Sequence, residues 1–472
     1  MKKRITILLL MLLGLFFSWS VNAAEKEYKI GMDVTYAPFE FTNDKGKLEG
    51  IDVDILKAIA KEEHLKLQLD TIGFNGAVQA AEAGQINGIM AGMMITEERK
   101  QHFNFSNPYF KSGVVMISKP GSRYTSLAST RGQKIAIKTG TAAAAYAQEL
   151  QKKYQWKLVT FDETNNVFND VLTGNAVACF EEEPIARYSI KTGVKLQVQT
   201  KAAKTGYYGF AVKKGTNGEL LAAFNRGLAK IKKNGEYDRI LSHYLSNEVA
   251  EKNKSTEKPF FTLFKENAPL LMKGLKLTLL LSVLGILGAT VVGILIGLLG
   301  VMPNKLCHGL SEIFIYTFRG LPVIVLALFI YSGFPLILGF KIPAMIAGVI
   351  TLSLNEGAYI AAFVKGGIQA VDKGQMEAAR SLGLSYGQAL MKIVLPQGLK
   401  LMIPSFVNQF IMTLKDTSIL SVIGLLELTQ MGKMIIARNM EGFRIWMMVA
   451  IIYVVIITLL TLLSQWLQKK VK

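Results

Sequence analysis

Residues 277–302, LTLLLSVLGILGATVVGILIGLLGVM, contain no charged side chain. An apolar run of this length can cross the roughly 30 Å hydrocarbon core of a bilayer as one α-helix. Four further apolar runs of similar length follow along the chain, at residues 320–340, 342–364, 401–426 and 445–467. The C-terminal half is therefore predicted to be an all-α membrane domain of five transmembrane helices.

Three charged residues interrupt these runs, namely Glu356, Lys415 and Asp416. A charge inside a span costs about 3 kcal/mol on insertion scales, so such side chains usually face protein or a cavity. Glu356 is predicted to line a pathway or to pack between helices. The neighbours Lys415 and Asp416 have the same two possibilities, or they neutralise each other.

The rest of the chain has a different character. Of the 472 residues, 50% are hydrophobic and 19% are charged, a mixture typical of a soluble part joined to a membrane part. The net charge of +19 does not indicate nucleic-acid binding, because no RNA- or DNA-reading motif stands out and many basic residues flank the apolar runs. The basic excess therefore favours a role in membrane orientation and a basic outer surface.

The first residues have the pattern of a secretory signal peptide, predicted at 1–23. The cations at 2–4 precede an apolar stretch at 5–19, and the small residues Val21 and Ala23 suit a signal peptidase. An uncleaved first membrane helix is the alternative. A secreted N-terminal domain places the start of the first span outside, so five crossings leave the lysine-rich C-terminus in the cytoplasm.

Residues 25–247 alternate short β-like runs with helical ones, which indicates an α/β domain with largely parallel strands. About 220 residues exceed what one typical core needs, so two lobes are expected. The charged stretch that follows has no apolar period and is predicted to be a linker at 248–264, leaving 265–472 as the membrane domain.

Four stretches of the α/β part, at 31–62, 73–109, 135–143 and 206–215, resemble the bacterial substrate-binding proteins that serve polar amino-acid importers. The resemblance implies a type II periplasmic-binding-protein-like fold, in which two α/β lobes on a double hinge close over one free amino acid. Such a ligand presents a carboxylate and an ammonium, so its pocket must offer a cation, amide donors and an anion.

The resemblance also implies the pocket residues. Arg99 matches the carboxylate-clamping arginine, Thr141 and Ala142 match a turn whose amides suit an anion, and Glu182 matches the acid for the ligand ammonium. The remaining expected ligand-binding residues are two aromatic side chains and four neighbours, namely Tyr36, Phe74, Asp33, Gly92, Met94 and Lys138.

Two departures from the family leave the ligand open. Glu182 stands where the family usually has aspartate and is flanked by Glu181 and Glu183, whereas Met94 replaces a usual hydroxyl. Glutamine is the first choice of ligand, with Lys138 serving an amide oxygen or a carboxylate. Asp33 together with Glu181 would instead favour arginine, lysine or histidine.

The segment EAARSLGLSYGQALMKIVLP, residues 377–396, lies between the third and fourth apolar runs and resembles the EAA loop of permeases that use an ATP-binding cassette (ABC). The matching residues are Glu377, Ala378, Ala379, Gly383, Ile393, Leu395 and Pro396. Two small alanines allow close approach of a partner, Gly383 is expected to end a first helix, and Pro396 to stop a second helix before the next span.

The resemblance implies an ABC ATPase as partner, and the chain has no phosphate-binding loop of its own. No cofactor is expected in this chain, and the ATP is used by the partner. The simplest assembly is two copies of the chain with two ATPase subunits. The expected location is the cell membrane, most simply of a Gram-positive bacterium, with the binding domain outside.

Other classes of protein are less favoured. A ligand-gated channel would have its membrane segments inside the binding domain, and a sensor would need a signalling domain. No catalytic or metal-binding residues are expected, because the four histidines are scattered and Cys179 and Cys307 are predicted to lie on opposite sides of the membrane. The sequence therefore predicts an importer subunit that combines ligand capture with translocation, not an enzyme.

Overall fold

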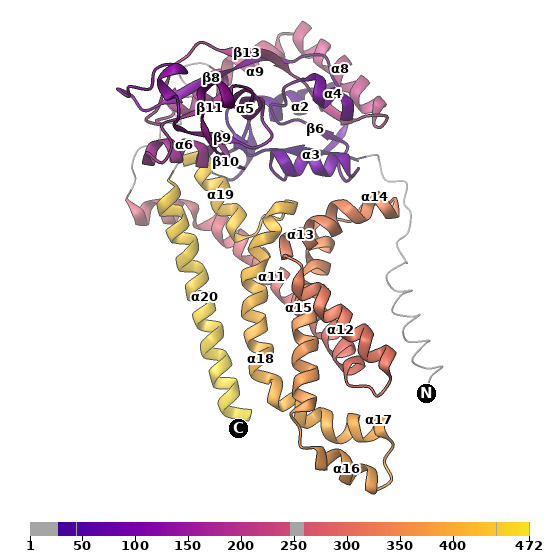
Figure 1. The fold of residues 1–472 in the computed structure, drawn as a ribbon. Helices are drawn as coiled ribbons and strands as arrows, with labels where there is room; N and C mark the ends of the chain where they lie inside the picture. The colour runs from indigo at the N-terminus through magenta and orange to yellow at the C-terminus, as the bar shows by residue number, and fades with distance from the viewer. Residues whose placement is uncertain (1–26, 44, 246–258, 440, 472) are drawn as a thin grey trace.

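The computed structural model describes residues 27–43, 45–245, 259–439 and 441–471. An α/β part occupies one end of the molecule and a bundle of long helices forms the rest (Figure 1). The predicted signal peptide at 1–23 lies outside the described residues, as does most of the predicted linker at 248–264. The end of that linker, from Phe260, is already the start of the first long helix.

The α/β part has two lobes, each built on its own sheet, as predicted. Lobe 1 comprises residues 27–109 and 209–245, and its sheet has the strand order β5-β1-β6-β14-β7. Its strands are β1 (Glu27–Met32), β5 (Lys66–Thr71), β6 (Gly88–Ile89), β7 (Phe103–Phe105) and β14 (Ala211–Lys213), with a small second sheet of β2 (Thr35–Tyr36), β3 (Glu40–Thr42) and β4 (Leu48–Glu49). Its helices are α2 (Ile51–Glu62), α3 (Phe74–Glu82), α4 (Glu97–His102), α8 (Gly218–Lys233) and α9 (Glu236–Leu245).

Lobe 2 comprises residues 110–208, and its sheet has the order β10-β9-β11-β8-β12, with β13 also paired to β8. Its strands are β8 (Phe110–Ser118), β9 (Lys134–Lys138), β10 (Lys157–Phe161), β11 (Ala178–Glu182), β12 (Gln197–Val198) and β13 (Ala203–Tyr208). Its helices are η1 (Ala128–Thr130), α5 (Ala142–Tyr154), α6 (Thr164–Thr173) and α7 (Glu183–Lys191). Strand β9 is buried along KIAIK after its first residue, because helices cover both faces of the sheet.

The chain passes between the lobes twice, and the two crossings are joined side by side. The Ser106 amide donates to the Phe210 carbonyl at 2.8 Å, and the Tyr109 amide donates to the Tyr208 carbonyl at 3.0 Å. The Ser106 hydroxyl in turn accepts from the Phe210 amide at 2.9 Å. The predicted double hinge is therefore present, and lobe 2 can rotate against lobe 1 about these paired strands.

The helical part begins with α11 (Phe260–Gly300), which packs along α15 (Ala344–Gln369). Glycines of α11 allow the two backbones to approach, because a Cβ at Gly293 or Gly297 would lie within 2.7 Å of Ile360 or Val364. The other helices are α12 (Lys305–Gly320), α13 (Val323–Leu328), η2 (Phe329–Gly333), α14 (Phe334–Leu338), α16 (Lys373–Ser381), α17 (Tyr386–Ala389), η3 (Leu390–Val394), α18 (Leu395–Asp416), η4 (Thr417–Ile423), α19 (Leu428–Asn439) and α20 (Gly442–Val471).

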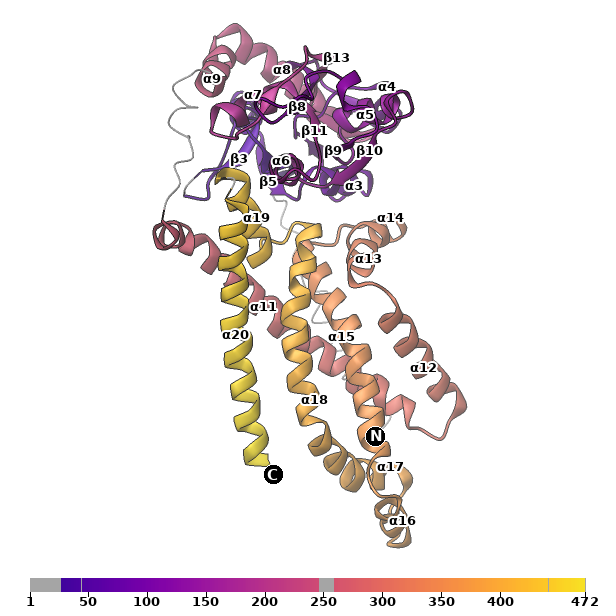
Figure 2. The same ribbon diagram turned by 60° about the vertical axis from the view of Figure 1, so that its left-hand side comes forward.

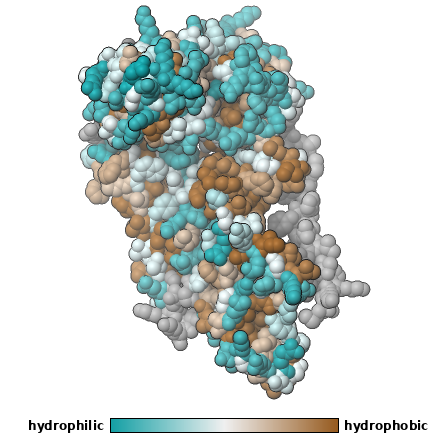
Figure 3. Space-filling model, viewed as in Figure 1, coloured by the Kyte–Doolittle hydropathy of each residue, from teal (hydrophilic) through white to brown (hydrophobic). Residues whose placement is uncertain are grey.

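Among the residues that the structure describes, the three helices α11, α15 and α20 are long and apolar enough to cross a membrane, and up to five spans result if each of two bent pairs counts as one. Apolar side chains cover much of the surface of the helical part, whereas polar side chains cover the α/β part and the opposite end (Figure 3). The helical, membrane-spanning character of this half is as predicted.

The second predicted span, residues 320–340, begins at a sharp bend, and the structure counts it as a span only together with α12, which the prediction left out. The chain bends by 103° between α12 and α13. Helix α12 ends at Gly320 because Pro322 disfavours helical geometry at Leu321, which is extended. Helices α13 and α14, which contain most of the predicted run, lie beside the α/β part (Figure 2). Hydropathy alone does not distinguish a bent segment from a straight one.

Candidate functional site

A closed pocket lies between the two lobes. Its cavity measures only about 10 Å³, because side chains of the two lobes meet across it. Nine residues line it, namely Asp33, Tyr36, Phe74, Ala91, Gly92, Arg99, Lys138, Thr141 and Glu182. Eight of these are among the ten ligand-binding residues predicted from the sequence. The other two, Met94 and Ala142, are not among the lining residues, and Ala91 was not predicted.

An ion pair between the lobes stands at the centre of the pocket. Lys138 Nζ, at the end of β9 in lobe 2, lies 2.5 Å from Asp33 Oδ2 in lobe 1, and both side chains are almost fully buried. Asp33 Oδ1 accepts from the Thr35 amide at 2.9 Å and from its hydroxyl at 2.7 Å. Burial alone would raise the pKa of Asp33, but the Lys138 ammonium and the Thr35 donors lower it below its usual value.

Arg99 reaches from lobe 1 toward lobe 2. Helix α4 starts at the N-cap Thr96, whose hydroxyl accepts from the Arg99 amide, and this cap sets the position of the arginine. Its guanidinium donates to the Met94 carbonyl at 2.6 Å and to the Gly140 carbonyl of lobe 2 at 2.8 Å. It also lies over the Phe74 ring, 5.3 Å from the centroid. A planar cation held in this way can present a fork to a carboxylate.

The acid that faces the pocket is Glu182, which is 2% exposed. The Tyr208 hydroxyl donates to Glu182 Oε2. Burial raises the pKa of Glu182, although the Tyr208 hydroxyl and the Arg99 charge partly offset it. The neighbouring acids point elsewhere: Glu181 accepts from the Glu182 amide at 2.8 Å, and Glu183 pairs with Arg187 in the first turn of α7.

The aromatic side chains form two walls. Tyr36 is buried, and Lys138 Nζ lies 5.0 Å from its ring centroid. Gly92 makes room for this ring, because a Cβ there would come within 2.4 Å of Tyr36, and its φ of 53° favours glycine. The Gly92 amide donates to Asp52 Oδ2 at 2.9 Å, which fixes the strand end that carries the glycine.

The lobe 2 side of the pocket includes the start of α5. Thr141 is its N-cap and accepts from the Ala144 amide at 3.1 Å, while its hydroxyl donates to the Lys138 carbonyl at 2.8 Å. The first-turn amides, including that of Ala142, have no partner within the helix and carry the positive end of its dipole. This end of α5 is therefore suited to an anionic group.

The hinge residue Tyr208 was missed at the sequence level. Its hydroxyl contacts both Glu182 and the Ser112 hydroxyl, the latter at 3.1 Å, so it links the hinge to the acid of the pocket. Tyr208 lies in the stretch GYYGF, which the sequence analysis included in the family resemblance without assigning any residue of it to the pocket. Met94 contributes its backbone rather than its side chain, because its carbonyl accepts from the Arg99 guanidinium.

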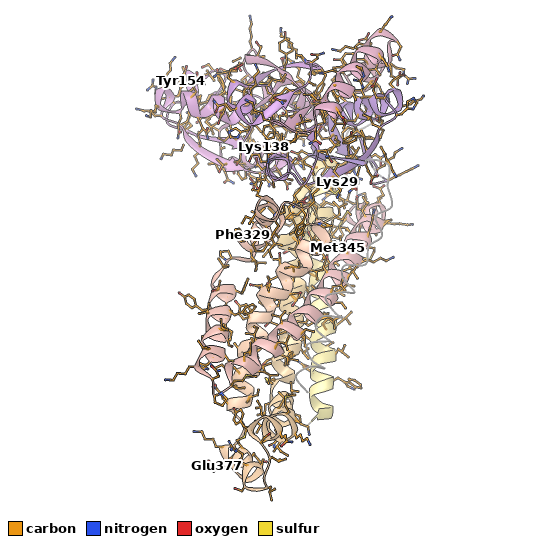
Figure 4. All side chains as sticks on the ribbon, turned by 90° about the vertical axis from the view of Figure 1, so that its right-hand side faces the viewer. Lys29, Lys138, Tyr154, Phe329, Met345 and Glu377 are labelled. Carbon is orange, nitrogen blue, oxygen red and sulfur yellow. The ribbon has the colours of Figure 1, made fainter. Side chains whose placement is uncertain are left out.

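The predicted EAA loop forms α16, α17 and η3 at the end of the helical part far from the lobes (Figures 1 and 4). Glu377 and Ala378 are exposed on α16, and Ala379 is buried. Gly383 follows the end of α16 with a φ of 88°, the left-handed conformation of a helix-ending glycine, as predicted. Ser385 then starts α17 with a capping box to Gln388.

The expectation that Pro396 stops the second helix was wrong. Helix α17 continues through the π-helical turn η3, where Ile393 lies half-buried, into α18, which begins at Leu395 with Pro396 in its first turn. The wider π turn accommodates the proline without a break. The loop is thereby joined rigidly to the span that follows it.

Glu356 of α15 is buried among polar side chains of the membrane part. The Gln409 amide of α18 donates to Glu356 Oε2, and the Asn355 amide donates to its Oε1 at 3.0 Å. Asp416 at the end of α18 is also within hydrogen-bonding reach. Glu356 therefore contacts α18, as expected of a polar group inside a span.

A two-lobed pocket on top of membrane-spanning helices defines a transport subunit that carries its own ligand-binding domain. Residues 28–247 match the bacterial extracellular solute-binding proteins, family 3, and residues 262–472 match the binding-protein-dependent transport system inner membrane component. The chain belongs to this family of ABC permeases and has a solute-binding domain fused in front of the permease domain. The permease domain is embedded in the membrane and the binding domain is extracytoplasmic.

Curated relatives match the permease half. The chain is 38% identical over 205 residues to the glutamine transport system permease protein GlnP of Escherichia coli K12, covering 43% of this chain and 94% of that one. It is 31% identical over 204 residues to the arginine transport system permease protein ArtQ of Bacillus subtilis, covering 43% and 93%. These relatives are transport permeases, so the prediction of a transporter subunit rather than an enzyme is confirmed, and the family implies a separate ABC ATPase.

Solved structures match the binding half. The substrate-binding domain 2 of GlnP from Lactococcus lactis is 39% identical and covers 47% of this chain and 96% of that one, with a TM-score of 0.37. The P235GK mutant of ArgBP from T. maritima is 30% identical and covers 47% and 95%, with a TM-score of 0.44.

Proposed function

We propose that the binding domain captures glutamine and delivers it to the permease domain of the same assembly. The observation that carries this proposal is the neutral pair formed by Asp33 and Lys138 at the centre of the pocket. Once other pocket residues bind the α-carboxylate and the α-ammonium of an amino acid, this pair is left to contact the ligand side chain.

The charge balance of the pocket supports the proposal. Arg99 suits the ligand carboxylate together with the start of α5, and Glu182 suits the ligand ammonium. Asp33 and Lys138 then remain, and their charges cancel. When lobe 2 rotates away, Lys138 parts from Asp33, and a carboxamide placed between them can accept from Lys138 and donate to Asp33. A cationic ligand side chain would lie beside the buried Lys138 ammonium, and an anionic one beside the buried Asp33 carboxylate.

A basic amino acid is the second candidate, because buried Asp33 and Glu181 both lie near Lys138, whose charge they stabilise. The relatives include an arginine permease as well as a glutamine permease. In this alternative Lys138 would have to move away or lose its proton to admit a second cation. The neutral pair of Asp33 and Lys138 favours glutamine over a basic amino acid.

Calorimetric titration of the full chain in lipid nanodiscs with each of the twenty amino acids tests the substrate. The expected result is tightest binding of glutamine, with arginine, lysine, histidine and glutamate at least tenfold weaker. Tighter binding of any basic amino acid would overturn the glutamine proposal in favour of the second candidate. The transporter assignment would remain unaffected.

The proposed assembly is two copies of the chain with two ATPase subunits, with ATP used only by those subunits. The EAA loop and the C-terminus are proposed to face the cytoplasm, which fits their position at the end away from the extracytoplasmic lobes (Figure 1). A Gram-positive cell membrane, with residues 1–23 cleaved as a signal peptide, is the proposed setting. Uptake into vesicles that persists without the ATPase subunit would contradict this division of labour.

A further inference from the structure

Lobe 1 is joined to the helical part by a continuous apolar core. Ile72 and Ala77 of lobe 1 belong to the same buried cluster as Leu326, Ile330 and Ile423 of the helical part. The approach is close, because a Cβ at Gly424 would lie 1.8 Å from Ile72 Cγ2. Burial of this kind is the main stabilising contribution in packed interfaces.

Polar contacts reinforce this junction. The Gln85 side chain donates to the Tyr331 carbonyl at 2.5 Å. Arg438 of α19 donates to the Asn43 carbonyl at 2.8 Å. Two sides of lobe 1 are thus tied to different helices, and lobe 1 is fixed to the permease domain.

Lobe 2 is attached differently. Its apolar core, which includes Ile135, Ala147 and Phe180, contains no residue of the helical part among those described. An ion pair between lobe 2 and the helical part joins Glu163, the N-cap of α6, to Lys433 of α19, with 3.3 Å between Oε1 and Nζ. Lobe 2 is therefore held by charge rather than by a shared apolar core.

Helix α19 lies across the border of the two lobes, next to the pocket. It contacts β2 and β3 of lobe 1 and α6 of lobe 2. Val34, which follows the pocket residue Asp33, packs on Met431 and Met434 of α19. One permease helix thus touches the fixed lobe and the hinged lobe together, which is possible only when the lobes are as close as they are here.

The position of Glu163 links this contact to the pocket. Burial raises the pKa of Glu163, the Lys433 charge lowers it, and Asp33 and Lys138 also act on it electrostatically. The four side chains therefore alternate in sign from the permease domain to the pocket, as Lys433, Glu163, Lys138 and Asp33. Alternating charges support the closed arrangement at each step.

We propose that Lys433 and Glu163 form a latch by which the permease domain holds lobe 2 closed against a lobe 1 that stays fixed. Opening the domain requires lobe 2 to rotate about the hinge and break the latch, whereas lobe 1 keeps its apolar contacts. The permease domain thereby favours the closed form by a ligand-independent contact, and any movement of α19 during the transport cycle would release lobe 2.

The Lys433–Glu163 ion pair is expected to shift the opening equilibrium of lobe 2 only modestly. The Lys433 and Glu163 side chains are 31% and 21% exposed, so the pair is partly screened by solvent. Pairs of this kind shift an equilibrium by about twofold to fivefold. A latch of that size can bias lobe 2 without locking it, which suits a step that must reverse in every cycle.

Single-molecule fluorescence transfer on the full chain in nanodiscs tests the latch without any amino acid, and so independently of the substrate. Fluorophores are placed at Lys61→Cys in lobe 1 and Lys152→Cys in lobe 2, both exposed positions, after replacement of Cys179 and Cys307. Lys433→Gln and Glu163→Gln should each lower the ratio of closed to open molecules by about twofold to fivefold. The double variant should be no worse than either single one.

The swap of Glu163→Lys with Lys433→Glu should restore the closed fraction. Glu149→Gln is the matched control, because Glu149 pairs with Lys204 inside lobe 2 and should leave the ratio unchanged. A second label pair, Lys61→Cys with Phe261→Cys on α11, should show a constant distance from lobe 1 to the permease domain. An unchanged closed fraction in both single variants, or a lobe 1 that moves against α11, would overturn the proposal.

Discussion

The pocket and the EAA loop are opposite kinds of functional site at opposite ends of one chain. The pocket is buried, and its charges come from residues as distant in sequence as Asp33 and Lys138, which pair across the lobes. The EAA loop is local and exposed, and its shape depends on one glycine and one capping box. The comparison teaches that the proposed capture site depends on long-range geometry, whereas the proposed site of coupling to the ATPase depends on short-range geometry. The two should therefore fail independently when mutated.

The largest expected effect is at the pocket. Arg99→Ala removes the guanidinium that bridges Met94 and Gly140, and it leaves a ligand carboxylate without its cation. Binding of glutamine should weaken at least about 100-fold, or roughly 3 kcal/mol. Calorimetry on the full chain measures this, with Lys100→Ala, the exposed neighbour on α4, as control. Near-normal affinity would refute the clamp.

At the other end, Gly383→Val should reduce ATP-driven uptake at least about tenfold and leave ligand binding within twofold. The side chain has space around it, but a β-branched residue at a φ of 88° strains the turn that ends α16. Uptake and calorimetry on the same preparation separate the two functions. Gly387→Ala is the matched control, because Gly387 lies inside α17 with open space around it. Loss of binding in Gly383→Val would break the proposed independence.

Lys138→Met tests whether the Lys138 ammonium sets the choice between glutamine and a basic amino acid. Without the ammonium, Asp33 keeps its Thr35 donors but loses its ion pair, so a ligand cation becomes the better partner. Glutamine affinity should fall about tenfold, and affinity for lysine or arginine should rise relative to it. Competition binding on the full chain measures the ratio. An unchanged ratio would show that Lys138 does not set the choice of ligand.

The smallest expected effect concerns stability. Burial raises the pKa of Glu181 from 4.5 to about 7, so the folded state binds a proton that the unfolded state has already lost between these pH values. The stabilising contribution is complete below about pH 4.5 and is lost as the pH rises to about 7. Glu181→Gln should remove this dependence and raise the free energy of unfolding at pH 8 by about 1 to 2 kcal/mol.

Thermal unfolding of the full chain at pH 5 and pH 8 measures the change. The difference between the variant and the natural chain should be larger at pH 8, while the decline due to Asp52, whose pKa burial raises to about 6, remains in both. A variant equally destabilised at the two pH values would mean that the Glu181 carboxylate is required for packing rather than costly when charged.

Much of the fold could be predicted because its signals are periodic or compositional. Apolar runs without charge predicted the helical membrane part, and alternating β-like and helical stretches predicted the two α/β lobes. The bend at Leu321–Pro322 was missed because hydropathy reports only how apolar a segment is, whereas the proline changes the backbone direction locally. The role of Pro396 was misjudged because the π turn before it is set by packing, not by composition.

The sequence predicted most of the residues that line the candidate site, but it did not predict how their side chains are arranged. Eight of the ten proposed ligand-binding residues line one pocket. Most of them lie at the end of a strand or the start of a helix, as Lys138 does at the end of β9 and Phe74 at the start of α3. Sequence could not choose among Glu181, Glu182 and Glu183. In the structure the acid that faces the pocket is Glu182, because β11 ends there and its carboxylate meets Tyr208, whereas Glu183 already belongs to α7.

The sequence by itself determined the class of the protein and its binding and permease domains, and it predicted the EAA loop, because each is encoded in residues close together along the chain. Only the tertiary structure decided that Asp33 meets Lys138 across the lobes, and that α19 lies against both lobes with Lys433 beside Glu163. These contacts join residues far apart in sequence, and burial, not local propensity, sets their distances.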